Sequence, residues 1–258
     1  MSYFITDTHC HITCDEMYPN IETIIENALA NHVKRMLIIC CTKIEYERAL
    51  EIQSKYTDLF DVAFGIYPHQ INDFKEEDYL YLEEQIKQNK LIAIGEIGLD
   101  YYWDNVSKED QLVGFHRQME LAKKYQIPVL IHNREATQDV LEVLKVYPEV
   151  KGLFHCFSGS LETAKIVTKM GYYCSFAGPL TYKNSRHAQD VALNIDLKWL
   201  FVETDSPYLT PHPYRKYRNE PKYVSVTFDK LCELKQIDHE TCAKQLEINY
   251  QTLFQKTE

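Results

Sequence analysis

Two histidines two residues apart close the first apolar run of the chain, in the sequence DTHCH at 7–11. In an extended segment side chains alternate between faces, so His9 and His11 point the same way and can approach one ion together. Further groups able to bind a metal lie at or just past the ends of later apolar runs: Glu96, His132, His155 and Asp205. A core histidine often only makes hydrogen bonds, but a histidine at a strand end has no evident packing role. We therefore predict that these six side chains bind metal.

The six candidate ligands are four imidazoles and two carboxylates. This mixture suits Zn²⁺, Mn²⁺, Ni²⁺ or Co²⁺ better than Ca²⁺, which prefers oxygen ligands, and Mg²⁺ is kept as a candidate. One zinc ion takes only three or four ligands from a protein, so two divalent ions are expected. Such ions bring the pKa of a bound water down toward about 7, which indicates hydrolysis. Glu96 and Asp205 are the expected catalytic carboxylates, and Asp205 is expected to accept a proton from that water.

The elements that must position these groups are strands with helical patterns between them. The candidate strands are 3–8, 36–42, 59–66, 91–97, 128–132, 152–156, 172–176 and 199–203. Most are near-continuous apolar runs, which is typical of parallel strands buried on both faces. The segments between them have helical spacing, as at Ile21, Ile24, Ile25 and Ala28, with Asn20 as the expected N-cap. Eight strands, each followed by a helix, predict an α/β fold: a (β/α)₈ TIM barrel in a single domain over 1–258.

The composition narrows the class of protein. The chain is 45% apolar and 26% charged, as in an ordinary globular protein, and it holds no run of about 18 apolar residues that would predict a membrane span. The N-terminus has no basic segment followed by an apolar one, so no secretory signal is expected, and eight cysteines without C-x-x-C pairs predict reduced thiols in a cytoplasmic protein. The net charge of −10 argues against coating of nucleic acid, but not against hydrolysis of a phosphodiester in a metal-filled pocket.

In a barrel enzyme the active site lies at the C-terminal ends of the strands, so residues that follow those ends are candidate substrate contacts. Arg134 either binds a phosphate or forms a salt bridge at a helix start. Tyr102, with Tyr101 and Trp103, either stacks on bases or packs the barrel rim. Arg218 is expected to add positive charge to the barrel mouth.

Two carboxylates near the candidate ligands, Asp100 and Glu203, are expected to orient ligands rather than to bind metal themselves. His69 and His212 lie in segments expected to be loops near the mouth, and their roles stay open. The four remaining histidines fall in helical patterns or at their ends and are interpreted as surface or packing residues.

Six motifs, taken together and in this order, resemble those of the TatD family of metal-dependent deoxyribonucleases, within the amidohydrolase superfamily. They are DTHCH at 7–11, GEIGLDYY at 95–102, IHNR at 131–134, HCFSG at 155–159, ETDSPYL at 203–209 and RNEP at 218–221. The resemblance covers nearly the whole chain. It implies one metal ion held by His9, His11 and Asp205. It implies a second ion held by His132 and His155, with Glu96 bridging both.

One position departs from the family pattern. The family often has Gly-x-His-Pro after the third strand, whereas this chain has GIYP at 65–68, so Tyr67 replaces a histidine. A phenol hydroxyl can still donate a hydrogen bond, and Tyr67 is expected to contact the substrate.

The resemblance implies a deoxyribonuclease of the 3′–5′ exonuclease type that acts on single-stranded DNA or on DNA ends. The residues by themselves indicate only two-metal hydrolysis, so two alternatives stay open. One is the same site acting on another ester or amide, such as a D-aminoacyl-tRNA ester. The other is a barrel scaffold without catalysis. Nothing in the sequence implies a membrane or a stable protein partner.

Overall fold

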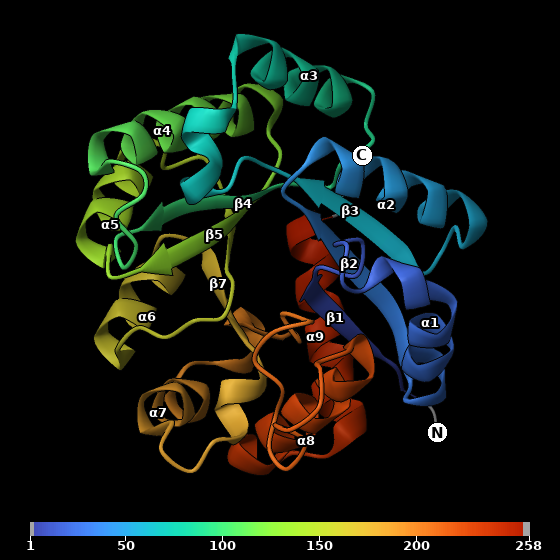
Figure 1. Ribbon diagram of the computed structural model, residues 1–258. Coiled ribbons are helices and arrows are strands. Elements are labelled where there is room, and N and C mark those ends of the chain that lie inside the picture. The colour runs from blue at the N-terminus through green and yellow to red at the C-terminus, as the bar shows by residue number, and fades with distance from the viewer. Residues whose placement is uncertain (1–2, 255–258) are drawn as a thin grey trace.

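Eight parallel strands form one sheet that curls into a barrel in the computed structural model, which describes residues 3–254 (Figure 1). The strands are β1 (Ile5–Cys10), β2 (Val33–Cys40), β3 (Phe60–Phe64), β4 (Ala93–Asp100), β5 (Val129–Arg134), β6 (Gly152–Phe154), β7 (Tyr172–Phe176) and β8 (Leu200–Val202). Their order in the sheet is their order in the chain, and each neighbouring pair is parallel. The predicted (β/α)₈ barrel is confirmed, and each predicted strand overlaps an observed one.

Helices surround the sheet (Figure 1). They are α1 (Ile21–Ala30), α2 (Lys43–Lys55), α3 (Glu76–Lys87), α4 (Lys108–Tyr125), α5 (Thr137–Val146), α6 (Leu161–Lys169), α7 (Arg186–Asn194), α8 (Val224–Lys235) and α9 (His239–Phe254). Within residues 3–254, no helix combines the length and the apolar character that crossing a bilayer requires. The predicted start of α1 is right, but Asn20 makes no side-chain capping bond. Asn20 ends a 3₁₀ turn (Tyr18–Asn20), so its backbone lacks the extended conformation that a capping side chain needs.

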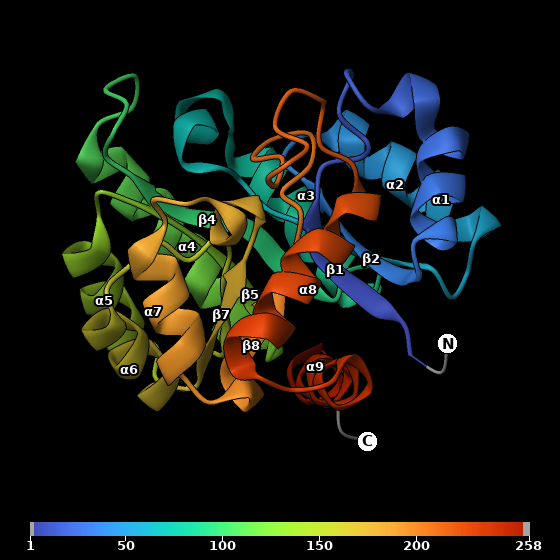
Figure 2. The same ribbon diagram turned by 90° about the horizontal axis from the view of Figure 1, so that it is seen from below.

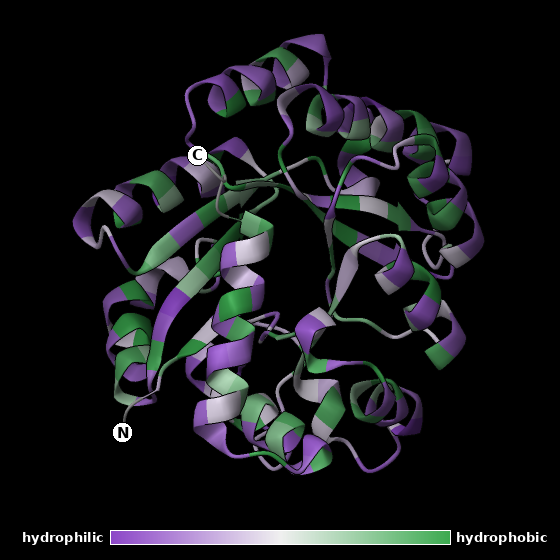
Figure 3. Cartoon of the chain, turned by 180° about the vertical axis from the view of Figure 1, so that it is seen from behind, coloured by the Kyte–Doolittle hydropathy of each residue, from purple (hydrophilic) through white to green (hydrophobic). Residues whose placement is uncertain are grey.

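The inside of the barrel is filled by apolar side chains, and α9 closes one end of it. Inward-facing residues from several strands form one buried cluster: Leu37, Ile39, Ala63, Ala93, Leu130, Leu153, Tyr173 and Phe201. Tyr250, Leu253 and Phe254 of α9 belong to the same cluster. Figure 2 shows α9 at the end of the barrel opposite the long loops, and Figure 3 shows it from behind, with hydrophobic and hydrophilic residues alternating along the surrounding helices. The inside of the barrel is therefore covered by α9 at this end.

The barrel closes between β1 and the segment that follows β8. The Asp205 amide donates to the His9 carbonyl at 2.9 Å, and the His11 amide donates to the Ser206 carbonyl at 2.8 Å. Cys10 and Ser206 form a parallel bridge at the same place. Closure of the sheet therefore brings Asp205 beside the two histidines of the first strand.

Candidate metal centre

All six predicted ligands meet at the end of the barrel opposite α9. His9 lies in β1 and His11 directly after it, Glu96 lies within β4, His132 lies in β5, His155 directly follows β6, and Asp205 follows β8. The predicted ligands supply two groups of three whose ligand atoms lie within 4.8 Å of one another: His9, His11 and Glu96 form one, and Glu96, His132 and His155 form the other. Glu96 belongs to both groups, so the arrangement has a shared carboxylate at its centre.

Each oxygen of Glu96 faces a different pair of histidines. Its Oε1 atom lies 2.6 Å from His132 Nδ1 and 2.7 Å from His155 Nε2. Its Oε2 atom lies 3.5 Å from His9 Nε2 and 3.7 Å from His11 Nε2. Asp205 Oδ1 adds a second carboxylate oxygen to the latter pair, at 3.7 and 3.6 Å. The donors therefore fall into two sets, one on each side of Glu96.

The spacing of the nitrogens fits divalent ions. His9 Nε2 and His11 Nε2 are 3.2 Å apart, and His132 Nδ1 and His155 Nε2 are also 3.2 Å apart. Two nitrogens at 2.0–2.1 Å from one tetrahedral zinc ion would be separated by about 3.3 Å. Each histidine pair is therefore spaced as two ligands of one ion are.

The electrostatics of the site favour the metal-binding form of the two carboxylates and of His9. Burial by itself would raise the pKa of Glu96, but the charges and hydrogen bonds of His155 and His132 hold it well below its ordinary value. Burial also opposes ionisation of Asp205, whose pKa is lowered by its hydrogen bond with His11 and by the charge of His155. Burial, together with His155, lowers the pKa of His9. Burial opposes protonation of the other three histidines, but the neighbouring carboxylates raise the pKa of His11, His132 and His155. Ionised carboxylates and neutral imidazoles are the forms that ligate a cation.

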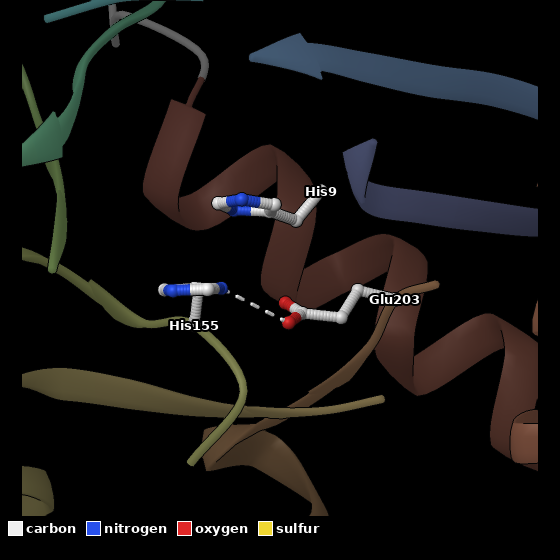
Figure 4. Close-up of side chains that lie close together, drawn as sticks. All are labelled: His9, His155 and Glu203. Atoms are coloured by element: carbon white, nitrogen blue, oxygen red, sulfur yellow. Dashed lines mark ion pairs between the residues drawn. The ribbon is translucent and has the colours of Figure 1, made fainter. Parts of the chain in front are cut away.

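Asp100 lies beside His132, and Glu203 lies beside both His155 and His9, with which it forms a third group of ligand atoms within 4.8 Å of one another. Asp100 Oδ2 is 3.0 Å from His132 Nε2, and Glu203 Oε1 is 3.4 Å from His155 Nδ1 (Figure 4). Glu203 also accepts a hydrogen bond from the Cys156 amide at 2.7 Å. The rings of His9 and His155 stack with their centroids 4.1 Å apart, as Figure 4 shows. In both His132 and His155, the ring nitrogen that faces away from Glu96 therefore has a carboxylate nearby.

The two histidines whose roles were open have different positions. His69 Nε2 lies 3.3 Å from Asp100 Oδ2, so it joins the group behind His132. His212 is exposed, and it is not among the residues that line the cavity over the ligands.

Two supporting residues were missed in the sequence. Asp7 is buried in β1 and accepts hydrogen bonds from the Thr204 amide at 2.9 Å and from the Thr204 hydroxyl at 2.6 Å, which ties β1 to the segment that carries Asp205. Burial raises the pKa of Asp7 to about 8, against the effect of these bonds. Gln111 of α4 bonds both the amide and the carbonyl of Asp100, each at 2.9 Å. The feature of the sequence that could have identified these two residues is a polar side chain within a pattern of apolar ones.

The local backbone is adapted to this crowding. Gly98 of β4 has φ +138°, and a Cβ atom there would lie 2.1 Å from the His132 carbonyl oxygen. Only glycine allows β4 and β5 to approach this closely. Asp205 and Cys156 have φ of 57° and 41°, in the left-handed region that side chains other than glycine seldom adopt. Strained residues of this kind cluster at functional sites.

A cavity of about 620 Å³ lies over the ligands, and two of the predicted substrate contacts line it. Tyr67 is one, and its hydroxyl is 3.4 Å from both Asp100 Oδ2 and His132 Nε2. Arg134 is the other, and its guanidinium lies 3.8 Å from the centre of the Tyr102 ring. Tyr102 is half exposed and does not line this cavity, but it stacks on Arg134, which does.

Two other rim residues are held by protein partners. Arg218 forms an ion pair with Glu16 at 2.9 Å and does not line the cavity, so the structure does not bring it to the ligands. Tyr101 donates a hydrogen bond to Asp139 at 2.8 Å and packs against the core, which is the rim-packing alternative. A substrate contact by Arg218 stays a prediction.

The chain matches the family model of TatD related DNases over residues 6–255. It is 40% identical over 250 residues to the uncharacterized metal-dependent hydrolase YabD of Bacillus subtilis, covering 96% of this chain and 98% of that protein. It is 30% identical over 256 residues to the uncharacterized metal-dependent hydrolase YcfH of Escherichia coli K12, covering 97% and 96%. The crystal structure of YjjV, a TatD homologue from Escherichia coli K12, superposes with a TM-score of 0.91 at 27% identity and 98% coverage of both chains. The chain therefore belongs to the TatD family of metal-dependent hydrolases.

Proposed function

We propose that this protein is a metal-dependent phosphodiesterase, a deoxyribonuclease that removes nucleotides from the 3′ ends of single-stranded DNA. The observation that carries the hydrolytic part is the position of Glu96, whose two oxygens face two histidine pairs at 2.6–3.7 Å. The choice of DNA rests on the family, whose model is named for DNases.

Two divalent ions, chosen from Zn²⁺, Mn²⁺, Mg²⁺, Ni²⁺ and Co²⁺, are proposed for the site. His9, His11 and Asp205 would hold one ion, and His132 and His155 would hold the other, with Glu96 between them. When bound, such ions supply a water of lowered pKa and positive charge that offsets the charge of the transition state.

The side chains of the protein supply the remaining steps. Asp205 lines the cavity, and its lowered pKa keeps it ionised at neutral pH, so it can take the proton from the attacking water. Asp100 and Glu203 hold His132 and His155 in the orientation that places one nitrogen of each beside Glu96. Arg134 and Tyr67 line the same cavity and are the proposed contacts to the substrate.

The test is a time course on a single-stranded oligonucleotide labelled at one end. A 5′ label is expected to give a ladder of stepwise shortened products, whereas a 3′ label is expected to appear at once in mononucleotides. A chelator should abolish both, and Mn²⁺, Zn²⁺ or Mg²⁺ should restore activity. The Glu96→Ala variant is expected to lose activity while its circular dichroism spectrum stays that of the wild type. Turnover by this variant at the wild-type rate would refute the proposed role of Glu96.

The same preparation separates the two alternatives. Turnover of small esters, amides or D-aminoacyl-tRNA, with oligonucleotides left intact, would assign another substrate to the site. A bound-metal content near zero in untreated protein, together with no turnover, would favour a scaffold without catalysis.

We further propose a cytoplasmic location without a stable protein partner. All eight cysteines are unpaired, including five that are buried: Cys10, Cys40, Cys174, Cys232 and Cys242. Free thiols in such number are typical of proteins in a reducing compartment. Cell fractionation with an antibody against the protein tests the location.

A further inference from the structure

One arginine that lines the cavity, Arg134, has two exposed aromatic rings beside it that do not line the cavity themselves. Tyr102 and Trp103 follow β4, which ends at Asp100, and Arg134 ends β5. The two strands are paired up to Asp100 and Arg134, so the three side chains leave the sheet at one level. These three residues are called the rim cluster below.

Arg134 is exposed and stacks on an aromatic ring, and it has no anionic partner among the described residues. Its guanidinium stacks 3.8 Å from the centre of the Tyr102 ring and lies 6.0 Å from that of Trp103. Within residues 3–254, no carboxylate is within ion-pair distance of it, and its side chain donates no hydrogen bond. By contrast, Arg218 is paired with Glu16. Stacking occupies the face of a guanidinium and leaves the N–H groups at its edge free, in a geometry that matches a phosphate.

The two rings offer apolar faces beside this cation. Tyr102 and Trp103 are 50% and 55% exposed, and their ring centroids are 4.9 Å apart in an edge-to-face arrangement. The preceding residue, Tyr101, is anchored to Asp139 and packs against the core. Two rings turned outward directly after an anchored one, beside an arginine that lines the catalytic cavity, provide a surface on which a nucleobase can stack.

The net charge of the protein affects where a nucleic acid can approach its surface. A net charge of −10 repels a polyanion from most of the surface, so an unpaired cation at the cavity is a local attraction. We propose that the rim cluster is a subsite for the nucleotide next to the phosphodiester being cleaved, with Arg134 on its phosphate and Tyr102 and Trp103 against its base. This inference rests on the proposed function and adds the binding of a neighbouring nucleotide to it.

The test compares two diesters. One is a short oligothymidylate, and the other is bis(4-nitrophenyl) phosphate, which has no base and no neighbouring phosphate. For Arg134→Ala, and for the Tyr102→Ala/Trp103→Ala double variant, the ratio of kcat/KM for the oligonucleotide to kcat/KM for the small diester is expected to fall about tenfold. The matched control is Arg117→Ala, because Arg117 also stacks on a tyrosine, Tyr79, at 3.6 Å, but lies outside this cavity. This control should keep the wild-type ratio.

Fluorescence gives a second measurement that does not depend on turnover. The chain has two tryptophans, so Trp199→Phe leaves Trp103 as the only one. In a Glu96→Gln background, which prevents cleavage, oligothymidylate is expected to quench Trp103 emission, and Arg134→Ala should weaken this binding by about tenfold.

The outcomes separate the subsite from the proposed function. A wild-type enzyme that hydrolyses both diesters, with an unchanged ratio in the rim variants and no quenching, overturns the subsite and leaves the phosphodiesterase intact. A metal-loaded wild-type enzyme that hydrolyses neither diester overturns both. A fall of the ratio in the rim variants, but not in Arg117→Ala, supports the subsite.

Discussion

Two cavities of nearly equal volume lie at opposite ends of this barrel. The catalytic cavity, of about 620 Å³, is at the C-terminal ends of the strands. The other, of about 600 Å³, lies under the N-terminal ends of β5 to β8 and against α9, and is called the basal cavity. Volume therefore says nothing about which of them performs chemistry.

The two cavities differ in how far their charged side chains are exposed to solvent. In the basal cavity, Lys123 and Glu149 form an ion pair at 2.6 Å with both side chains about half exposed, and the deeper wall is aromatic, with the rings of Tyr173 and Trp199 5.1 Å apart. In the catalytic cavity the carboxylate of Glu96 is only 5% exposed. Burying charges is expensive unless they are well paired, so a buried group of this kind indicates function rather than stability.

The largest expected effect follows from removing the charge of Glu96. Glu96→Gln keeps the shape but loses the ionised oxygens that face the two histidine pairs. Activity is expected to fall by more than the roughly 10–100-fold typical of residues outside the ligand shell, and bound metal should fall with it. The measurements are kcat/KM on the oligonucleotide and metal content by mass spectrometry.

The matched control for this change is Glu149→Gln in the basal cavity. It removes the same charge from a half-exposed ion pair, which contributes little to stability. Equal losses of bound metal in the two variants would contradict the contrast between the cavities.

A smaller effect is expected from the carboxylates behind the ligands. Asp100→Asn and Glu203→Gln leave the candidate ligands in place but remove the negative charges beside His132 and His155, which are proposed to orient them. Affinity for metal is expected to fall roughly 10–100-fold. Because Asp100 lies beside His132 whereas Glu203 lies near both His155 and His9, titration of the Asp100→Asn apoprotein should show one ion weakened more than the other. Equal weakening of both ions would argue against two separate ligand sets.

How much of the structure could be predicted from the sequence depends on how far apart in the chain the contacting residues are. The six candidate ligands could be selected from the sequence because metal binding demands particular residue types, and because each one lies on or beside an apolar strand that is visible by itself. The end of β4 could not be predicted in this way. The predicted strand covers 91–97, but β4 continues to Asp100 because it pairs with β5. Glu96 therefore lies within its strand rather than at the end.

Contacts between distant segments were beyond local patterns. Asp7 bonds Thr204, which is 197 residues away in the chain, and Gln111 bonds Asp100 from the next helix. For Arg134, a local pattern left open a phosphate contact or a salt bridge, and only the fold shows that it stacks on Tyr102 without an ion pair. Packing, rather than residue type, decides such roles.

Substitution of Tyr67 tests whether the catalytic cavity tolerates the loss or replacement of a hydrogen-bond donor. Its hydroxyl is 3.4 Å from Asp100 and His132, at the long end for a hydrogen bond. Tyr67→Phe is therefore expected to lower kcat/KM by only about two- to tenfold, which corresponds to one hydrogen bond. Tyr67→His introduces the residue that is frequent in the family and should retain more activity than Tyr67→Phe. A loss as large as that of Glu96→Gln would place Tyr67 among the catalytic groups.

The smallest expected effect on activity, and the clearest on stability, comes from the basal cavity. Trp199 is partly buried there against Tyr173, so Trp199→Ala removes apolar contact without touching any ligand. The free energy of unfolding is expected to fall by about 2 kcal/mol, less than for a fully buried tryptophan. Tm should fall by roughly 4–8 °C for a domain of this size, as calorimetry would show. If kcat/KM on the oligonucleotide stays at the wild-type value, the two ends of the barrel are independent. A parallel loss of activity would mean that packing under β8 helps to position Asp205.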